Sequence, residues 1–232
     1  MKLAIMQPYF LPYPGYFQLI AAVDVFVVYD NIKYVKSGWI NRNRLCRNGE
    51  AATFSLPLKH ASDSLDVRER ELAAAFDPEK LLNQFRGAYG QAPQFARVFA
   101  WLEQVIRHAE RNLFRYLDHS IRTACDLLAV GTEIRTSSDI AIDHTLKKQD
   151  KVIALCRAAG ARTYVNAIGG TELYDKEEFR RQGIGLEFLR SKPFEYPQLE
   201  PAFVPSLSIV DALMFNSLEI VRARVADHYE LI

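Results

Sequence analysis

The sequence predicts an α/β protein built on a mainly parallel sheet, with an inserted helical block. A strand, a loop, a helix and a second strand follow one another within residues 1–30, the order of a βαβ unit. Strands and helices alternate again in residues 131–190, whereas residues 66–130 carry apolar side chains at helical spacing. We therefore expect both ends of the chain to contribute strands to one sheet, with the helical block between them.

Length and composition are those of an ordinary globular protein. The chain has 232 residues, of which 49% are hydrophobic and 25% charged, and its net charge is +1. Such a balance gives no overall field that favours nucleic acid, and no apolar run reaches the roughly 18 residues of a membrane span. The three cysteines and five histidines are scattered without metal-ligand spacing. We expect a cytoplasmic protein with reduced thiols, no metal site and no membrane span.

The first βαβ unit is the clearest local prediction. Residues 2–6 and 25–29 are short continuous apolar runs that fit buried parallel strands. Residues 15–23 lie between them and place apolar side chains at helical spacing.

A hairpin and the helical block follow. Asn48-Gly49 is a strong two-residue turn signal, and it would join a strand near 39–46 to one near 51–58. Side chains alternate along a strand, so Arg42 and Arg44 should share one face and Asn41 and Asn43 the other. In the block, Asp77-Pro78 has the cap and first residue of a helix, and apolar side chains recur at helical spacing over residues 94–130.

The second half returns to alternating elements. The pattern predicts strands at 133–137, 162–167 and 186–190, helices at 146–159 and 176–182, a proline-rich crossing loop at 191–205, and helical structure from Ser206 onward. This arrangement favours one α/β domain over residues 1–232, with residues 66–130 as a helical elaboration within it.

The opening loop is the first candidate site. In an open parallel sheet, ligands bind beyond the carboxyl ends of the strands, and Gln7, Tyr9, Tyr13, Gly15 and Tyr16 follow the first strand. The helix starting at Gly15 would point unpaired N–H groups at an anion, while tyrosines can stack on a ring and donate hydrogen bonds. The alternative is a proline-rich loop whose tyrosines only pack against the helical block.

The spacing of Tyr13 and Tyr16 suggests a comparison with nucleotidyl-transferring enzymes. Those enzymes carry His-x-Gly-His after their first strand, and here Tyr13-Pro14-Gly15-Tyr16 takes that place. The sheet is accordingly expected to be Rossmann-like and nucleotidyltransferase-like, with Tyr16 as a catalytic candidate. Tyrosine can donate a hydrogen bond to phosphate, but it supplies no cation at neutral pH.

The second strand and the hairpin supply further candidates. Asp30 ends the second strand, where it could act as a general base, hold a sugar hydroxyl or cap the turn. Arginines with neighbouring amides suit phosphate or carboxylate recognition, although a solvated hairpin face is the simpler interpretation. The candidates after Asp30 are Lys33, Trp39, Asn41, Arg42, Asn43 and Arg44.

Two later segments add weaker candidates. Asn166, Gly169 and Gly170 follow another predicted strand, where a glycine pair can present N–H groups to an anion or form a plain turn. Ser208 and Asp211 have the types and spacing of a capping box, so capping is their first explanation.

Asn216 follows an apolar run and has no such structural explanation. A metal held by Asp30 and Asp211 stays open, but nothing in the sequence requires one.

Four blocks of the chain resemble the WbqC-like protein family. These blocks are QPYFLPYPGYFQLI, VFVVYDNIKYVKSGWINRNRL, YVNAIGGTELYDKEEFRRQGIGLEFL and SLSIVDALMFN, in that order. The resemblance implies a bacterial cytoplasmic protein associated with O-antigen or other surface polysaccharide synthesis. One departure is that the family commonly continues with a small residue and glycine after the last asparagine, where this chain has Ser217-Leu218.

Together these features favour a transferase or ligase acting on a nucleotide-linked sugar or an activated acyl group. In this hypothesis the helix at Gly15 holds an anion, Arg42 and Arg44 neutralise phosphate or carboxylate, and Asp30 orients a hydroxyl or acts as general base. The cofactor is not determined; a nucleotide, either ATP or a nucleotide-sugar, fits the pattern. The alternative is a non-catalytic nucleotide- or sugar-binding accessory protein of the same pathway. The sequence predicts no nucleic-acid partner and leaves a homo-oligomer open.

Overall fold

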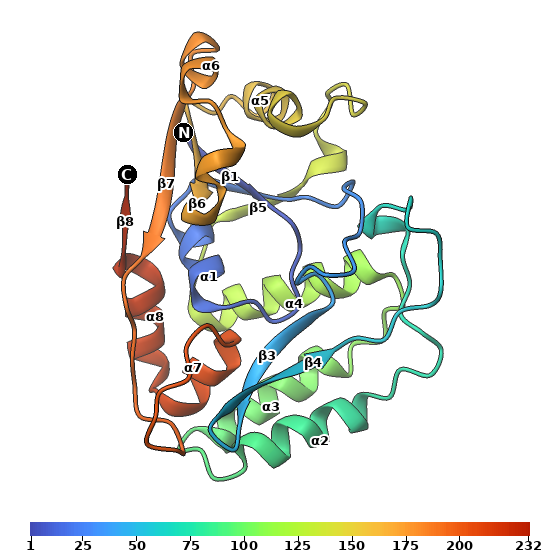
Figure 1. The fold of residues 1–232 in the computed structure, drawn as a ribbon, viewed down its shortest axis with the longest axis vertical. Helices are drawn as coiled ribbons and strands as arrows, with labels where there is room; N and C mark the ends of the chain where they lie inside the picture. The colour runs from blue at the N-terminus through green and yellow to red at the C-terminus, as the bar shows by residue number, and fades with distance from the viewer.

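The computed structural model describes all residues from 1 to 232 and contains a six-stranded main sheet (Figure 1). The strand order is β5 (Glu133–Thr136), β2 (Val25–Val28), β1 (Lys2–Met6), β6 (Thr163–Ala167), β7 (Gly185–Ser191) and β8 (Tyr229–Leu231). All neighbouring pairs are parallel except β7 with β8. The predicted mixed α/β architecture with a mainly parallel sheet is therefore confirmed, and β8 is an additional strand that the sequence did not indicate.

Eight α-helices surround the sheet and the separate hairpin. They are α1 (Pro14–Ala21), α2 (Pro78–Tyr89), α3 (Phe95–Ile106), α4 (Leu113–Leu128), α5 (Lys148–Ala158), α6 (Lys176–Arg181), α7 (Ile209–Phe215) and α8 (Leu218–Asp227). Short 3-10 segments cover Val67–Glu69, Ser137–Asp139 and Ile168–Leu173. No helix is long and apolar enough to cross a membrane.

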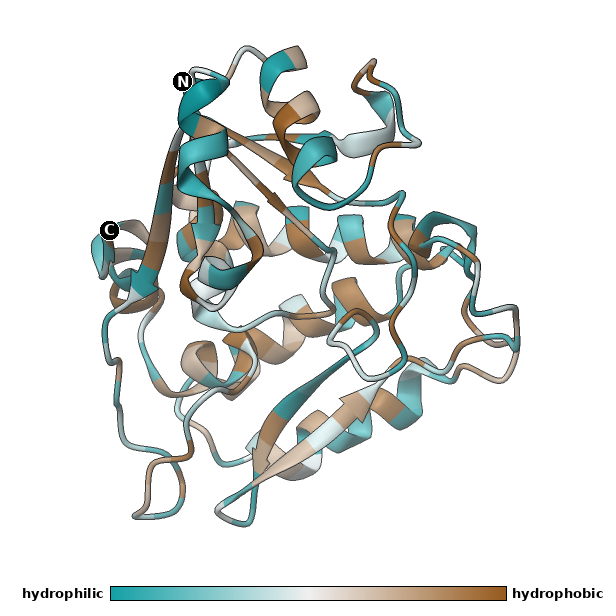
Figure 2. Cartoon of the chain, turned by 45° about the horizontal axis from the view of Figure 1, so that its top comes forward, coloured by the Kyte–Doolittle hydropathy of each residue, from teal (hydrophilic) through white to brown (hydrophobic).

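The two faces of the sheet have separate cores, because side chains alternate along each strand. Leu3 and Val25 pack with buried residues of α5 and α6. Ala4 and Phe26 face the opposite way, into a larger core shared with α1, α4, α7 and α8. Figure 2 shows apolar colouring along the strands of the main sheet, between these helical layers.

The larger core also includes the helical block and the hairpin. Strands β3 (Arg42–Arg47) and β4 (Glu50–Ser55) form a separate antiparallel pair beside α2 and α3 (Figure 1). Asn48 and Gly49 both have positive φ, at 53° and 75°, as the predicted tight turn requires. This shared core supports our view of one domain with an inserted helical block, which stays a prediction.

Part of the block is extended where we expected helix. Residues 70–73 pair with other segments: Leu72 N donates to the Arg111 carbonyl at 2.8 Å, and Leu113 N donates to the Arg70 carbonyl at 2.8 Å. These bonds satisfy the backbone without a helix. The α2 helix then starts as predicted, with the Asp77 side chain accepting from Glu79 N at 2.9 Å.

The strand order reverses between β1 and β6, and this reversal positions the site. From β1 the chain moves outward to β2 and β5, and it then returns to β6 on the other side of β1. Connections leaving β1 and β6 therefore diverge in opposite directions. In open parallel sheets, this divergence leaves a crevice beyond the carboxyl ends of the two strands.

Candidate functional site

A pocket lies at the carboxyl ends of β1 and β6, where the strand order reverses. It has a volume of about 410 Å³ and is lined by Ile5, Met6, Gln7, Tyr9, Tyr13, Tyr29, Ile32, Val152, Asn166, Ala167, Gly169, Gly170, Leu173 and Tyr174. Six of the predicted site residues meet there: Gln7, Tyr9, Tyr13, Asn166, Gly169 and Gly170. No lining residue carries a charge at neutral pH.

Several polar groups of this pocket have no partner within the protein. Asn166 is only 6% exposed, and its side-chain amide makes no hydrogen bond with another protein group. The Gln7 amide and the Tyr9, Tyr13 and Tyr29 hydroxyls are likewise unpaired with protein groups. None of these atoms is among the inaccessible unpaired ones, so they face the open pocket, where a ligand or water can pair with them. The arrangement therefore suits a ligand that accepts and donates several hydrogen bonds.

The glycine pair has a packing explanation that also serves the pocket. Gly170 lies against Asn166, and a Cβ at Gly170 would overlap the Asn166 amide. The turn after β6 needs this glycine to leave room for the side chain that enters the pocket. The segment forms a 3-10 turn, Ile168–Leu173.

The tyrosines of the pocket are hydrogen-bond donors at neutral pH. Burial raises the pKa of the Tyr13 and Tyr174 hydroxyls. For Tyr9, burial and then the neighbouring Tyr13 raise the pKa. Burial, with smaller contributions from Tyr174 and Asp66, raises the pKa of Tyr29 to about 12. With neutral hydroxyls and aromatic faces, these residues suit stacking on a sugar or planar ring.

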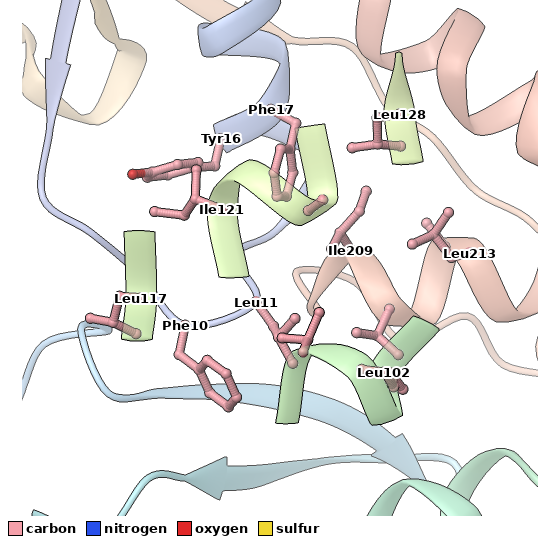
Figure 3. Close-up of a cluster of buried hydrophobic side chains, with 14 of the residues drawn as sticks. Phe10, Leu11, Tyr16, Phe17, Leu102, Leu117, Ile121, Leu128, Ile209 and Leu213 are labelled. Atoms are coloured by element: carbon pink, nitrogen blue, oxygen red, sulfur yellow. The ribbon is translucent and has the colours of Figure 1, made fainter. Parts of the chain in front are cut away.

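Tyr16 belongs to the core rather than to the pocket. It is 1% exposed and lies among Phe17, Ile121 and other apolar side chains (Figure 3). Its hydroxyl donates to the Gln7 carbonyl at 2.9 Å, and burial raises its pKa well above the ordinary value. We therefore assign Tyr16 to holding the Gln7 backbone, and no longer to catalysis.

Gly15 is tightly packed at the start of α1. The Tyr13 ring and the Ser191 hydroxyl lie beside it: a Cβ there would be 2.6 Å from Tyr13 Cε2 and 2.7 Å from Ser191 Oγ. The glycine is thus needed for close packing within the protein, which is a structural reason for it besides close approach to an anion. The phosphate position on this helix stays a prediction.

Asp30 ties two strand ends together. It is 2% exposed; its Oδ1 accepts from Ser137 Oγ at 2.7 Å and Ser138 N at 3.0 Å, and its Oδ2 accepts from Ser138 Oγ at 2.7 Å. These bonds join the carboxyl end of β2 to that of β5. A carboxylate engaged in this way is a structural link, so the general-base hypothesis loses its main support.

The amides of the hairpin are also structural. Asn43 is buried, and its Nδ2 donates to the Leu11 carbonyl at 2.9 Å and the Phe10 carbonyl at 3.3 Å. Asn41 accepts from the Tyr34 hydroxyl at 2.7 Å and donates to the Leu56 carbonyl at 2.8 Å.

The charged residues and the tryptophan of this region do not line the pocket. Lys33 is exposed and pairs through its backbone with Asp66. Trp39, Arg42 and Arg44 form a separate group. The predicted convergence of the arginines with Gln7 and Asn166 in one pocket is therefore wrong.

The candidates near the C-terminus serve the fold. Ser208 caps α7 through Val210 N at 3.3 Å and also donates to the Leu11 carbonyl at 2.7 Å. Asn216 ends α7, with its Nδ2 donating to the Ala212 carbonyl at 2.9 Å. Ser217 then caps α8 at the point of departure from the family pattern.

Asp211 does not complete a capping box. It is fully buried and accepts from the hydroxyls of Tyr89 and Tyr196, both at 2.8 Å, and from Gln198 Nε2 at 2.7 Å. It thereby holds the crossing loop 191–205 against α2 and α7. Burial raises its pKa although these three donors act in the opposite direction. No group of three or more His, Cys, Asp and Glu side chains is placed to hold a metal ion.

Sequence reasoning missed part of the pocket wall. Tyr29 follows β2 directly, and its position at a strand end could have indicated it. Lys151 lies behind Tyr29: it is 5% exposed, its Nζ is 5.0 Å from the Tyr29 ring centroid, and it donates to the Asn31 carbonyl at 3.2 Å. Nothing in the helical pattern of α5 distinguishes this lysine from surface lysines.

The sequence matches the model of the WbqC-like protein family over residues 7–223. The chain belongs to the WbqC-like protein family. The uncharacterized protein Rv1507c of Mycobacterium tuberculosis is similar to it, with 28% identity over 218 residues, which cover 93% of each protein. The match includes both the opening loop and the 166–170 turn, so the family region contains every lining residue of the pocket except Ile5 and Met6.

Replacing Gly15 with alanine should lower stability by about 1–3 kcal/mol, as overpacking does, despite the higher helix propensity of alanine. Gly87→Ala is the matched control, because Gly87 lies in α2 with no atom within 4 Å of an added Cβ. It should raise stability by about 0.5–1 kcal/mol. Urea denaturation of both variants tests the comparison, and equal stabilisation by both would contradict the close packing at Gly15.

Asp30→Asn should lower the free energy of unfolding by about 1–3 kcal/mol, because one acceptor oxygen is lost from a buried cluster. A double-mutant cycle with Ser138→Ala should give a coupling of about 0.5–3 kcal/mol. Additive effects would show that Asp30 does not act through Ser138.

Asp211 should make stability depend on pH in a defined direction. Its folded pKa is raised, so the folded state binds more protons than the unfolded state between the ordinary and the raised value. Stability then falls as pH rises through that window. Relative to Asp211→Asn, the wild type should therefore be more stable near pH 4 than near pH 7 in chemical denaturation. A pH-independent difference would contradict this.

Proposed function

We propose that the pocket between β1 and β6 binds the sugar or acyl part of an activated substrate, and that the protein is a transferase or ligase of bacterial surface polysaccharide synthesis. The observation that carries the proposal is the set of unpaired polar groups in an aromatic pocket at the strand-order reversal. Asn166 is the most informative member, because its largely buried side chain has no protein partner and its polar atoms remain accessible from the pocket.

The chemical character of the lining supports a neutral ring. Tyr9, Tyr13 and Tyr29 offer aromatic faces and hydroxyl donors, and the Gln7 and Asn166 amides can each donate and accept. Ligand pockets generally combine apolar walls with a few placed polar groups. A nucleotide-linked sugar or an activated acyl group has a portion of this kind, and a nucleotide, either ATP or the nucleotide part of the substrate, is the cofactor that we propose.

The remaining parts of the proposal follow from the sequence. A Rossmann-like, nucleotidyltransferase-like arrangement agrees with the mainly parallel sheet and the reversal between β1 and β6. Membership of the WbqC-like family supports a cytoplasmic place in O-antigen or related synthesis. With Tyr16 and Asp30 engaged in structural bonds, catalysis would depend on positioning the two substrates rather than on a protein nucleophile.

A non-catalytic accessory protein is the second candidate function. The absence of a charged residue from the pocket lining favours it, because transfer chemistry usually needs a proton acceptor or a charge near the reacting atoms. Under this alternative the same pocket binds the sugar without turnover.

Asn166→Leu separates binding from folding. The amide bonds no protein group, so the variant should melt at the wild-type temperature or above. Its affinity for a ligand of the pocket should fall by about 0.5–1.5 kcal/mol per lost neutral hydrogen bond. Thermal shift with neutral sugars, nucleotide-sugars and activated acyl donors identifies the ligand, and calorimetry then measures the variant.

Gln104→Leu is the control, since Gln104 is exposed on α3. If every compound that stabilises the wild type stabilises Asn166→Leu equally, the pocket is not the ligand site. Consumption of a stabilising compound in the presence of an acceptor supports the transferase, and stabilisation without consumption supports the accessory protein.

A further inference from the structure

An exposed tryptophan, Trp39, precedes strand β3 in the chain, and two guanidinium groups lie against its ring. Trp39 is 38% exposed. The Arg44 Cζ atom is 5.1 Å and the Arg42 Cζ atom 5.8 Å from its ring centroid. Both distances are within the range of a cation–π interaction.

The hairpin fixes both guanidinium groups. Arg42 and Arg44 are two residues apart on β3, so their side chains leave the same face of the strand. Arg42 Nε donates to the Gly38 carbonyl at 2.9 Å, and Arg44 Nη2 donates to the Ser206 carbonyl at 3.0 Å. Each bond uses one of five N–H donors of the guanidinium, and neither arginine is in a salt bridge.

One donor in this group is buried without a partner. Arg44 Nε is inaccessible and makes no hydrogen bond, which is unfavourable for a charged group. Residues 31–49 contain Lys33, Lys36, Arg42, Arg44 and Arg47 but no Asp or Glu. Asp63 pairs with Lys36 at 3.0 Å, whereas Arg42 and Arg44 have no carboxylate partner. These two guanidinium groups therefore attract anions.

We propose that Trp39, Arg42 and Arg44 form a second binding site, separate from the pocket, for a diphosphate group. Arginine binds phosphate oxygens through paired N–H groups. Both guanidinium groups lie against the same Trp39 ring, so one diphosphate can bring a phosphate to each of them. The exposed part of the Trp39 ring is available to a base, so the experiment below distinguishes two sources of the diphosphate, a nucleotide and a simple diphosphate.

Trp39 is a built-in reporter for this site. The chain has two tryptophans, and Trp101 is buried in α3 at 7% exposure. Inorganic pyrophosphate should change the fluorescence of the wild type, and this change should be absent in Trp39→Phe. A nucleoside 5′-diphosphate that binds tighter than pyrophosphate identifies a nucleotide as the source, and equal affinities identify a simple diphosphate.

Arg42→Gln and Arg44→Gln should each weaken pyrophosphate binding at least about tenfold in calorimetry, because each loses charged hydrogen bonds. Arg47→Gln is the matched control: it removes the same charge from the same strand, but Arg47 leaves the opposite face of β3. The affinity of the Arg47→Gln variant for pyrophosphate should stay within about twofold of the wild-type affinity, because an exposed charge at a distance is screened by salt.

Arg42→Lys and Arg44→Lys keep the positive charge, so they provide a second test if the glutamine variants do not fold. Retained folding with weaker binding in the lysine variants supports paired N–H recognition. The proposal is overturned if pyrophosphate leaves Trp39 fluorescence unchanged, if Arg47→Gln weakens binding as much as Arg42→Gln, or if only anionic lipid vesicles or heparin bind.

Discussion

The backbone of the opening loop is held in place by one side chain of the helix that follows it and by groups from two distant parts of the chain, and the pocket depends on this restraint. The Gln7 carbonyl accepts from Tyr16, the Leu11 carbonyl accepts from both Asn43 and Ser208, and Ile209 N donates to the Pro12 carbonyl at 2.8 Å. Leu11 has a positive φ of 44°, which an ordinary residue adopts only when its surroundings enforce it.

These bonds explain why polar motifs far apart in sequence meet without forming one ligand site. Tyr16, Asn43 and Ser208 are part of three of the blocks that resemble the WbqC-like family, and all three bond the opening loop rather than a ligand. A loop with three prolines has few backbone donors, so its carbonyls need side-chain partners when buried. The loop is thereby fixed where Gln7, Tyr9 and Tyr13 line the pocket.

The sequence predicted the fold better than the site, and the reason is physical. Strands and helices bury one face, so apolar residues recur in the sequence with the period of the element. The mainly parallel sheet, the Asn48-Gly49 turn and the Asp77 cap were confirmed. Site residues were chosen by polarity at strand ends, and buried polar groups serve either a ligand or the backbone. Asn166 and Asn43 are both buried asparagines; only their partners, which no single-sequence pattern reveals, distinguish a free amide from a structural one.

The wall of the pocket is linked to the edge of the sheet through a buried cation. Ser137 Oγ contacts both Asp30 and Asn31, Asn31 accepts from Lys151, and the ammonium group of Lys151 faces the Tyr29 ring. No carboxylate forms a salt bridge with Lys151, and burial lowers its pKa while Asp66 and Asp30 oppose that shift. An ammonium group in such a place is retained only if its partners compensate for lost hydration. Both of its hydrogen bonds go to Asn31, at 3.2 and 3.3 Å, and the Tyr29 ring is its other close partner, so moving Tyr29 would cost Lys151 part of its stabilisation. The pocket wall is consequently held by electrostatics as well as by packing, which agrees with the proposed binding of a neutral ring against a fixed aromatic face.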